Sequence, residues 1–357
     1  ASLQAILDEF ELEPVDVVYV DAGTYFAGAP PITITQTDSG WSNLYVTIQG
    51  STNPAAPTML RAPSLTTPFV MELKYAVNVR LKNLSIINAA AGLVANYTSG
   101  CELDSVRLEG NQDVGLQLQN DNEGFRLVRS ILRNNNSLQG GLGAAINRSS
   151  LSIENSVFWG SPKAVFISSG NLTVTNSVME ASGPGGRIYD FASGASATAF
   201  RGDYNAYSLN NGALICEQQR PAIGSEFYGD LPAWTALTGA DRHSMSQDPL
   251  FADAVRGDFH PRSTQGRFVS GIWTNDAVLS PLVDAGAPGW PSDREPAPNG
   301  GIINIGAYGN TPESSMTQTN PPWLRVVSYN SGGTMAGTVL LYWLHGGMES
   351  NALVQLD

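Results

Sequence analysis

The sequence predicts an all-β solenoid, and three observations support this. Five segments between residues 71 and 183 share one pattern, in which apolar and polar residues alternate up to a pivot and an apolar residue follows three positions later. The pivots recur 22, 24, 26 and 21 residues apart, at Asn83, Ser105, Arg129, Asn155 and Asn176. Repeats of roughly 20 to 50 residues are typical of solenoids. The alternation has the period of a strand, and no run here is apolar at helical spacing. The pattern therefore predicts a right-handed parallel β-helix, in which each coil covers the open strand edges of its neighbour.

The residues next to each pivot predict the interior of the coils. The apolar residue two positions before each pivot is expected in a single internal column made of Leu81, Leu103, Leu127, Ile153 and Val174. The pivots Asn83, Asn155 and Asn176 would stack as an asparagine ladder, because side-chain amides can satisfy one another. A guanidinium inside the coil would be costly, so we expect Arg129 to turn outward or to bulge the chain.

Length, charge and cysteine content restrict the protein class. A chain of 357 residues is admissible as one main domain, because a solenoid adds coils without enlarging a single core. The net charge of −13, with only three lysines, argues against nucleic acid and anionic membranes as partners, and against polyanionic sugars unless a cation is bound. No apolar run is long enough to span a membrane. Cys101 is expected in the core, and the sequence leaves open whether it pairs with Cys216.

The N-terminal residues predict a cap. Residues 2–10 place Leu3, Ile6, Leu7 and Phe10 on one helical face, which suits a helix that covers the first coil. Strands are expected at 17–21, 32–34 and 45–50. The sequence opens without a signal-peptide pattern, so we expect that any export signal has been removed or lies outside it.

Several motifs resemble one superfamily. These are the helix Ser2-Leu-Gln-Ala5, the segment 18–25, and the coils Asn83-Leu-Ser-Ile86 and Asn155-Ser-Val-Phe158. They are similar to the pectate-lyase-like β-helix superfamily of secreted and cell-surface proteins. The resemblance extends to about residue 310, since residues 203–207, 247–253, 280–286 and 299–308 resemble the closing coils of its extracellular members. It implies an extracellular or cell-surface location and a polysaccharide partner, and is weak for activity because one fold hosts many functions.

The remainder predicts the domain organisation. Residues 1–310 would form the β-helix with its cap and closing coils, and the polar, proline-ended stretch 311–322 a linker. Strands in 323–357 would form part of an immunoglobulin-like β-sandwich or, alternatively, an end cap. The first alternative implies a longer polypeptide with further modules.

One grouping predicts lyase chemistry. The lyases of this superfamily use lysine, arginine and calcium to remove a proton beside a carboxylate and to stabilise the resulting charge. Here Lys163, at a turn, could lie near Arg187 and Glu180 of the next coil, although a turn lysine is usually only solvated. No aspartate runs like those of the polygalacturonase branch occur.

A second grouping contains potential metal ligands, namely Asp241, Asp248, Asp253, Asp258 and His260. Its spacing matches no metal motif, so no metal site is predicted here. Calcium stays open as a cofactor because the chain is acidic, although no calcium-binding loop motif is present.

Aromatic residues lie in or beside two long loops, 181–202 and 209–248. Aromatic faces stack on sugar rings, so these residues predict a sugar-binding platform made of Trp159, Tyr189, Tyr204, Tyr207, Tyr228 and Trp234. The alternative is that they pack the loops against the wall.

Two functions follow. The first is a secreted or cell-surface β-helix module that binds a polysaccharide, with lyase-type β-elimination as a further hypothesis. The second is a non-catalytic structural or adhesive module of a large bacterial-type surface protein. The aromatic-lined loops favour the first, and the incomplete catalytic set and the C-terminal strands favour the second.

Overall fold

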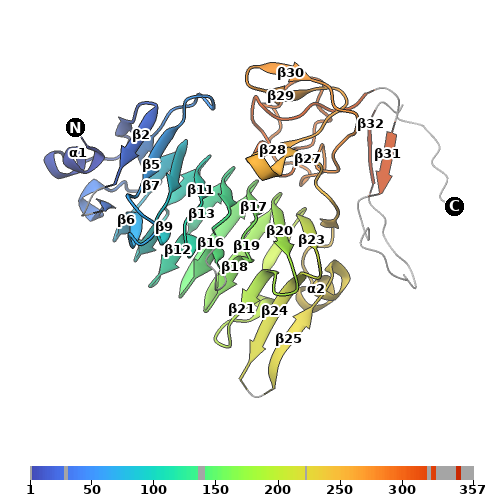
Figure 1. Cartoon of the computed structure of the whole chain (residues 1–357), viewed down its shortest axis with the longest axis horizontal. Helices are drawn as coiled ribbons and strands as arrows, with labels where there is room; N and C mark the ends of the chain where they lie inside the picture. Colours follow the sequence, from blue (N-terminus) through green and yellow to red (C-terminus); the bar gives the residue numbers. More distant parts are fainter. Residues whose placement is uncertain are drawn as a thin grey trace.

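The computed structural model describes residues 2–27, 31–135, 141–221, 223–319, 323–326 and 343–346. Three parallel sheets form the walls of a β-helix whose coils follow one another from α1 to α2 (Figure 1). Within the described chain, each regular coil contributes one strand to each sheet. The predicted parallel β-helix is therefore confirmed.

The three walls are named here by their strands. Sheet A contains β1 (Val17–Tyr19), β4 (Val46–Gln49), β7 (Val79–Lys82), β10 (Glu102–Asp104), β13 (Phe125–Val128), β16 (Ser149–Glu154), β19 (Gly170–Thr175) and β22 (Arg201–Asp203). Sheet B contains β2 (Gly23–Phe26), β5 (Thr58–Arg61), β8 (Leu84–Ile87), β11 (Arg107–Glu109), β14 (Ile131–Arg133), β17 (Val157–Trp159), β20 (Val178–Ser182), β23 (Ala206–Asn210) and β26 (Met245–Ser246). Sheet C contains β3 (Ile32–Ile34), β6 (Phe69–Lys74), β9 (Ala91–Asn96), β12 (Val114–Gln119), β15 (Leu142–Ile146), β18 (Lys163–Ile167), β21 (Arg187–Phe191), β24 (Leu214–Arg220) and the antiparallel β25 (Gly224–Tyr228).

The internal column is present as predicted. Leu81, Leu103, Leu127, Ile153 and Val174 are successive register partners in sheet A, and all are fully buried. Every pivot has a positive φ, between 45° and 57°, so the pivots form the tight left-handed turn between sheets A and B. Asparagine tolerates this conformation better than most residues. Arg129 points outward as expected, and its Nη2 lies 2.7 Å from Asp104 Oδ1.

The internal polar ladder lies one residue beyond the pivots. In successive coils, the backbone N–H at this position donates to the side-chain oxygen at the equivalent position of the next coil. The accepting side chains are, in order, Ser130, Ser156, Ser177, Asn205 and Ser244. The predicted asparagine ladder at the pivots is reduced to one hydrogen bond, in which Asn176 Nδ2 donates to Asn155 Oδ1 at 3.5 Å. A left-handed residue rotates the chain, so its successor faces inward and satisfies the buried N–H groups.

The expected N-terminal helix is confirmed as α1 (Leu3–Glu9), which buries Leu3 and Leu7. Ser2 Oγ caps it by accepting from the N–H of Ala5. Gln4 Oε1 accepts from the N–H of Thr33 at 2.7 Å, so α1 lies along the edge of β3. The opposite end of the β-helix is covered by α2 (Leu231–Thr238), from which Trp234 is fully buried.

Of the segments expected as closing coils, 203–207 continues the β-helix in β22 and β23, whereas 247–253, 280–286 and 299–308 do not. Residues 249–317 fold back along the outside of sheet B and contain β27 (Phe251–Asp253), η3 (Ala254–Arg256), β28 (Asp258–Pro261), β29 (Arg267–Val269) and β30 (Ile272–Thr274) (Figure 1). We call this segment the flank cap. Its apolar residues, including Phe251, Phe259 and Leu282, join outward-facing Val157 and Val178 in one buried cluster. The outer face of sheet B is apolar at these coils, so burying it stabilises the flank cap there.

The C-terminal strands β31 (Trp323–Val326) and β32 (Trp343–Gly346) form an antiparallel pair. Most of 323–357 lies outside the described residues, so the immunoglobulin-like sandwich and the domain boundaries stay predictions. Part of the expected linker is packed, however: the Met316 N–H donates to the carbonyl of Gly266, and Ser315 Oγ donates to the carbonyl of Pro261.

Cys101 and Cys216 are both buried and free. No helix in the described ranges is long and apolar enough to cross a membrane.

Candidate functional site

A polar pocket of about 410 Å³ lies on the outside of sheet B, where the chain passes from β26 toward the flank cap. It is lined by Trp159, Tyr207, Ser208, Leu209, Asn210, Ser246, Gln247 and Asp248. We call it the flank pocket. Strands β17 and β23 supply part of its lining, and Ser246 at the end of β26 supplies the rest together with Gln247 and Asp248. Its volume lies near the lower end of the range for small-molecule sites, roughly 300 to 1,000 Å³.

Trp159 ends β17 and is held at the side of the flank pocket by aromatic contacts. Its ring meets Phe251 edge-on at 5.5 Å between centroids and Phe259 at 5.9 Å. Both phenylalanines belong to the flank cap, and Trp159 stays half-buried. The packing therefore fixes the indole while it remains partly open to solvent, which is the arrangement that aromatic ligand contacts require.

Three polar side chains of the flank pocket are open or partly open to solvent. Asn210 and Asp248 are exposed, and Gln247 is half-buried. Asn210 Nδ2 donates to Ser208 Oγ at 3.3 Å, and Asp248 Oδ1 accepts from the N–H of Leu250 at 2.9 Å. Amide and carboxylate groups held in this way can donate to and accept from hydroxyl groups.

Glu180 belongs to β20, the strand between β17 and β23 in sheet B. It is buried, stands opposite Ser208 in the register of β20 and β23, and its Oε2 accepts from the N–H of Gly160 at 2.8 Å. Burial raises the pKa of the Glu180 carboxyl, although hydrogen bonds from Gly160 and Asn210 oppose the shift. Glu180 therefore supports Asn210 and Gly160 and is closed off from solvent.

The structure brings together two of the three residues predicted for lyase chemistry. Lys163 and Arg187 are register partners on β18 and β21 of sheet C, whereas Glu180 lies on sheet B. Lys163 Nζ forms an ion pair with fully buried Asp190, and Arg187 Nε lies 3.2 Å from Glu217 Oε2. Arg187 also donates to the carbonyls of Pro184 and Gly186. Both cations are thus held by partners within the chain.

The predicted aromatic platform is wrong for three of its six residues. Tyr189, Tyr207 and Trp234 are fully buried and pack together, with the rings of Tyr189 and Trp234 stacked 5.1 Å apart. Tyr207 and Trp234 both donate to buried Asp241, at 2.6 and 2.7 Å. These rings seal the end of the β-helix core and cannot reach a sugar.

The other three aromatics are half-buried and separate. Trp159 lies in the flank pocket, Tyr204 stacks on the ring of His243 at 4.8 Å, and Tyr228 lies on β25. Tyr207 also lines the flank pocket but is fully buried, so among the six predicted aromatics Trp159 presents the partly open ring there.

The predicted acidic grouping is divided between three places. Asp241 is buried beneath α2, where burial raises its pKa against the hydrogen bonds that it accepts. Asp258 and His260 form an ion pair in the flank cap, and Asp248 lines the flank pocket. Across the described residues, no three histidine, cysteine or carboxylate side chains gather as a metal site would require. Calcium stays a prediction, and no step is derived through it.

Sequence reasoning missed most of the flank pocket. Ser208 and Asn210 carry no motif, and Gln247 begins the segment 247–253, which the sequence predicts only as a closing coil. These residues meet because β23 and β26 are neighbours in sheet B. The sequence does offer one signal. Ser208 and Asn210 place polar side chains on the outward face of their strand, where the earlier coils of sheet B carry apolar residues such as Val157 and Val178.

Comparison with known proteins agrees with this architecture. The family described as "Right handed beta helix region" matches residues 69–185. The protein is a right-handed parallel β-helix. No curated protein matches it in sequence. Similar solved structures include an alginate lyase from Paenibacillus sp. str. FPU-7, at 12% identity and a TM-score of 0.39, covering 60% of this chain and 94% of that one.

Two further solved structures are similar to this β-helix. Pectate lyase Pel9A matches at 14% identity with a TM-score of 0.47, covering 86% of this chain and 90% of that one. The Geobacillus virus E2 protein ORF18 matches at 13% identity with a TM-score of 0.37, covering 60% of this chain and 56% of that one. Similarity at these levels carries no conclusion about activity.

Proposed function

We propose that this β-helix binds glycan chains in the flank pocket, with Trp159 as the stacking surface and Asn210, Gln247 and Asp248 as hydrogen-bonding partners. The observation that supports this proposal is the pairing of a fixed, partly open indole with amide and carboxylate groups in one pocket. An aromatic face with a few polar groups at its rim is a common arrangement for orienting a small polar ligand.

The charges around the flank pocket favour a neutral sugar. No lysine or arginine is among its lining residues, and Asp248 contributes a carboxylate. A uronate would meet this carboxylate without a neighbouring cation, in a protein whose net charge is −13. Hydroxyl groups of a neutral sugar can instead donate to Asp248 and exchange hydrogen bonds with Asn210 and Gln247.

A glycan panel tests this proposal. Wild-type protein and the variants Trp159→Ala, Asn210→Ala and Asp248→Asn are compared on neutral and uronate-containing glycans. Neutral glycans should bind the wild type, and each variant should bind more weakly by roughly 1 to 3 kcal/mol, since it loses a stacking or hydrogen-bonding group. Asp113→Asn, an exposed aspartate in the turn between β11 and β12, is the matched control. Binding that none of the pocket variants reduces would reject the flank pocket.

Lyase activity is a second candidate, supported by the register pairing of Lys163 and Arg187 on the outer face of sheet C. Its test follows unsaturated products by ultraviolet absorbance, together with reducing ends, on uronate polysaccharides with and without calcium. Any elimination must disappear in Lys163→Ala. If no substrate changes, lyase activity is rejected for those substrates, which favours the alternative of a non-catalytic adhesive or structural module.

The location proposed for this module is extracellular or at a cell surface, where its glycan partners occur. Further modules of the same polypeptide are proposed as neighbours. Detection of the protein in secreted and surface-exposed fractions of its source cells, rather than in the cell interior, tests the location.

A further inference from the structure

The first coil of the β-helix is left incompletely covered. Val18 and Tyr25 are register partners of Ile48 and Leu60 in the second coil. Ile48 and Leu60 are fully buried, whereas Val18 and Tyr25 are only half-buried. Their side chains pack on the core from one side, and none of the coils that the structure describes lies on the other. Apolar surface that α1 does not reach therefore stays open at this end of the molecule.

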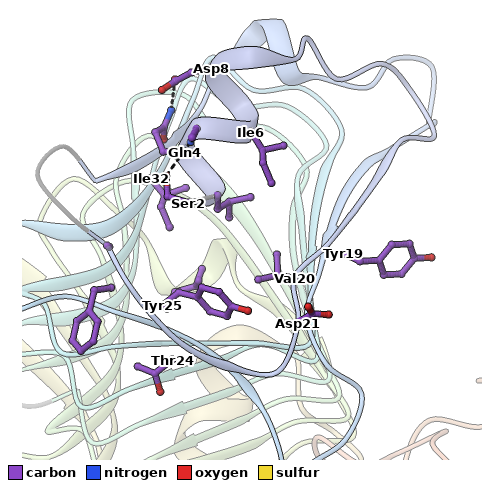
Figure 2. A pocket seen from close by; sticks show the side chains of 15 residues that line it. Ser2, Gln4, Ile6, Asp8, Tyr19, Val20, Asp21, Thr24, Tyr25 and Ile32 are labelled. Atoms are coloured by element: carbon purple, nitrogen blue, oxygen red, sulfur yellow. Dashed lines mark hydrogen bonds between the residues drawn. The ribbon is translucent and has the colours of Figure 1, made fainter.

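A pocket of about 790 Å³ occupies this end, between α1 and the strands β1 and β2 (Figure 2). Its apolar lining includes Leu3, Ile6, Val20, Tyr25 and Ile32. Figure 2 shows Val20 and Tyr25 beneath the helix, with Asp21 at the rim and Tyr19 pointing away. The pocket is nearly twice the volume of the flank pocket and more apolar in its lining. We call it the end pocket.

Two strand edges border the end pocket. In the part of the chain that the structure describes, β1 pairs only with β4 and β2 only with β5. The N–H groups of Gly23 and Ala27 donate toward the second coil, to Pro57 and Arg61. Because alternate residues of a strand direct their backbone groups to opposite sides, Thr24 and Phe26 direct theirs away from it. The edge of β3 is less available for pairing, because the N–H of Thr33 already donates to the side-chain oxygen of Gln4 in α1.

The charge around the end pocket is predominantly negative. Residues 1–60 contain no lysine or arginine, and their acidic residues are Asp8, Glu9, Glu11, Glu13, Asp16, Asp21 and Asp38. All of these except Asp38 are exposed, and Asp8 and Asp21 line the end pocket itself. The first basic residue of the chain is exposed Arg61, which pairs in register with Phe26 of β2, so six exposed carboxylates face one guanidinium at this end. A ligand of opposite charge is attracted to this end, and a like-charged ligand is repelled.

We propose that the N-terminal end of the β-helix binds an extended, positively charged polypeptide segment. The segment adds to the free edge of β2 as a further parallel strand and inserts an apolar side chain into the end pocket. Strand addition supplies backbone hydrogen bonds, while the pocket and the acidic rim select the sequence. A second copy of this chain does not fit the same end, because two ends of this composition carry the same charge.

Fluorescence anisotropy of labelled peptides tests the proposal with the whole protein. One probe of about eight residues, enough for a strand, alternates lysine and valine, and the other alternates glutamate and valine. The lysine peptide should bind, and the glutamate peptide should not. Raising the salt concentration from roughly 0.05 M to 0.5 M should weaken the binding, because the attraction is between exposed charges.

Two variants separate the strand edge from the charge. Thr24→Pro removes an outward N–H from β2, where an edge strand tolerates proline, and should abolish most of the binding. Asp21→Lys reverses one rim charge and should weaken binding roughly tenfold. Asp113→Lys, far from this end, is the matched control and should leave binding unchanged. Circular dichroism checks that Thr24→Pro is folded, and exposed Asp21 can be changed without disturbing the core.

Three results would overturn the proposal. The first is equal binding of the glutamate peptide, and the second is unchanged binding by folded Thr24→Pro or by Asp21→Lys. The third is a dimer of the free protein, measured by light scattering, that Thr24→Pro dissociates, since the occupant would then be a second copy of the chain.

Discussion

The side-chain amide of Asn155 donates to the backbone carbonyl of Asn304 at 3.0 Å, across 149 residues of sequence. One coil later, Asn176 Oδ1 accepts from the N–H of Ala287 at 2.7 Å. These asparagines belong to the left-handed turns of the wall, and the residues that they contact belong to the flank cap. The turns therefore also attach the flank cap to the β-helix.

Asn155→Ala should destabilise the protein more than the same change at another pivot. Removing the amide leaves the buried carbonyl of Asn304 without this donor, which costs about 1 to 3 kcal/mol. Asn83→Ala is the control because Asn83 has a similar φ, 52° against 45°, and precedes the coils that the flank cap covers. Urea denaturation compares the two. If both variants lose the same unfolding free energy, the strain of placing alanine at a positive φ explains the destabilisation, and the bond to Asn304 contributes nothing.

Glu295→Gln should stabilise the protein at neutral and higher pH. Burial raises the pKa of Glu295 to about 7, because hydrogen bonds from Asn310 and Asn304 do not offset the loss of hydration. The folded state thus binds the proton more tightly than the unfolded state. The resulting stability is fully present below the unfolded pKa and is lost as pH rises through about 7.

Thermal unfolding from pH 5 to pH 8 measures this effect. The Tm of the wild type should fall over this range by more than that of Glu295→Gln, with a difference equivalent to about 3 kcal/mol. Parallel pH profiles of the two proteins would contradict the role of Glu295.

Lys163→Met should destabilise the fold whether or not Lys163 takes part in catalysis. Asp190 is fully buried and forms an ion pair with Lys163, so the change leaves a buried carboxylate without its cation, at a cost of about 3 kcal/mol. The double variant Lys163→Met with Asp190→Asn should recover most of this loss. Denaturation midpoints of the single and double variants make the comparison, and additive losses would argue against a coupled pair.

Trp234→Ala should lower stability by about 3 to 5 kcal/mol, because it removes a large buried side chain that packs on Tyr189 and donates to Asp241. Trp41, which is 62% exposed, supplies the control: Trp41→Ala should change stability by less than about 0.5 kcal/mol. Glycan binding by folded Trp234→Ala should equal that of the wild type. A selective loss of binding would instead favour a direct role for the indole.

The regular coils could be predicted because their pattern is local. Leu81, Leu103 and Leu127 each lie two residues before a pivot, so alternation within a strand places them inside without knowledge of distant contacts. The sequence pattern places the polar ladder at Asn155, whereas in the structure it runs through Ser156, one residue later. Strand periodicity does not include the rotation that a positive φ introduces at the pivot.

The flank cap and the flank pocket could not be predicted in the same way. The motif 280–286 has the composition of a coil, but Leu282 is buried against the outside of sheet B rather than within the helix. That choice depends on the outward residues Val157 and Val178, more than 100 positions earlier. Likewise, Trp159 and Trp234 both lie beside long loops, and only tertiary packing makes one partly open and the other buried.

The flank cap distributes its support unevenly along the solenoid. Arg107 and Arg133 donate to the carbonyls of Gly257 and Val255 in the flank cap, and Asn155 and Asn176 hold its later turns. Among the described residues, the first two coils make no such hydrogen bond to the flank cap. Heat or mechanical force should therefore unfold the N-terminal coils before the coils that the flank cap covers. A peptide strand bound to the edge of β2 would stabilise these N-terminal coils against unfolding.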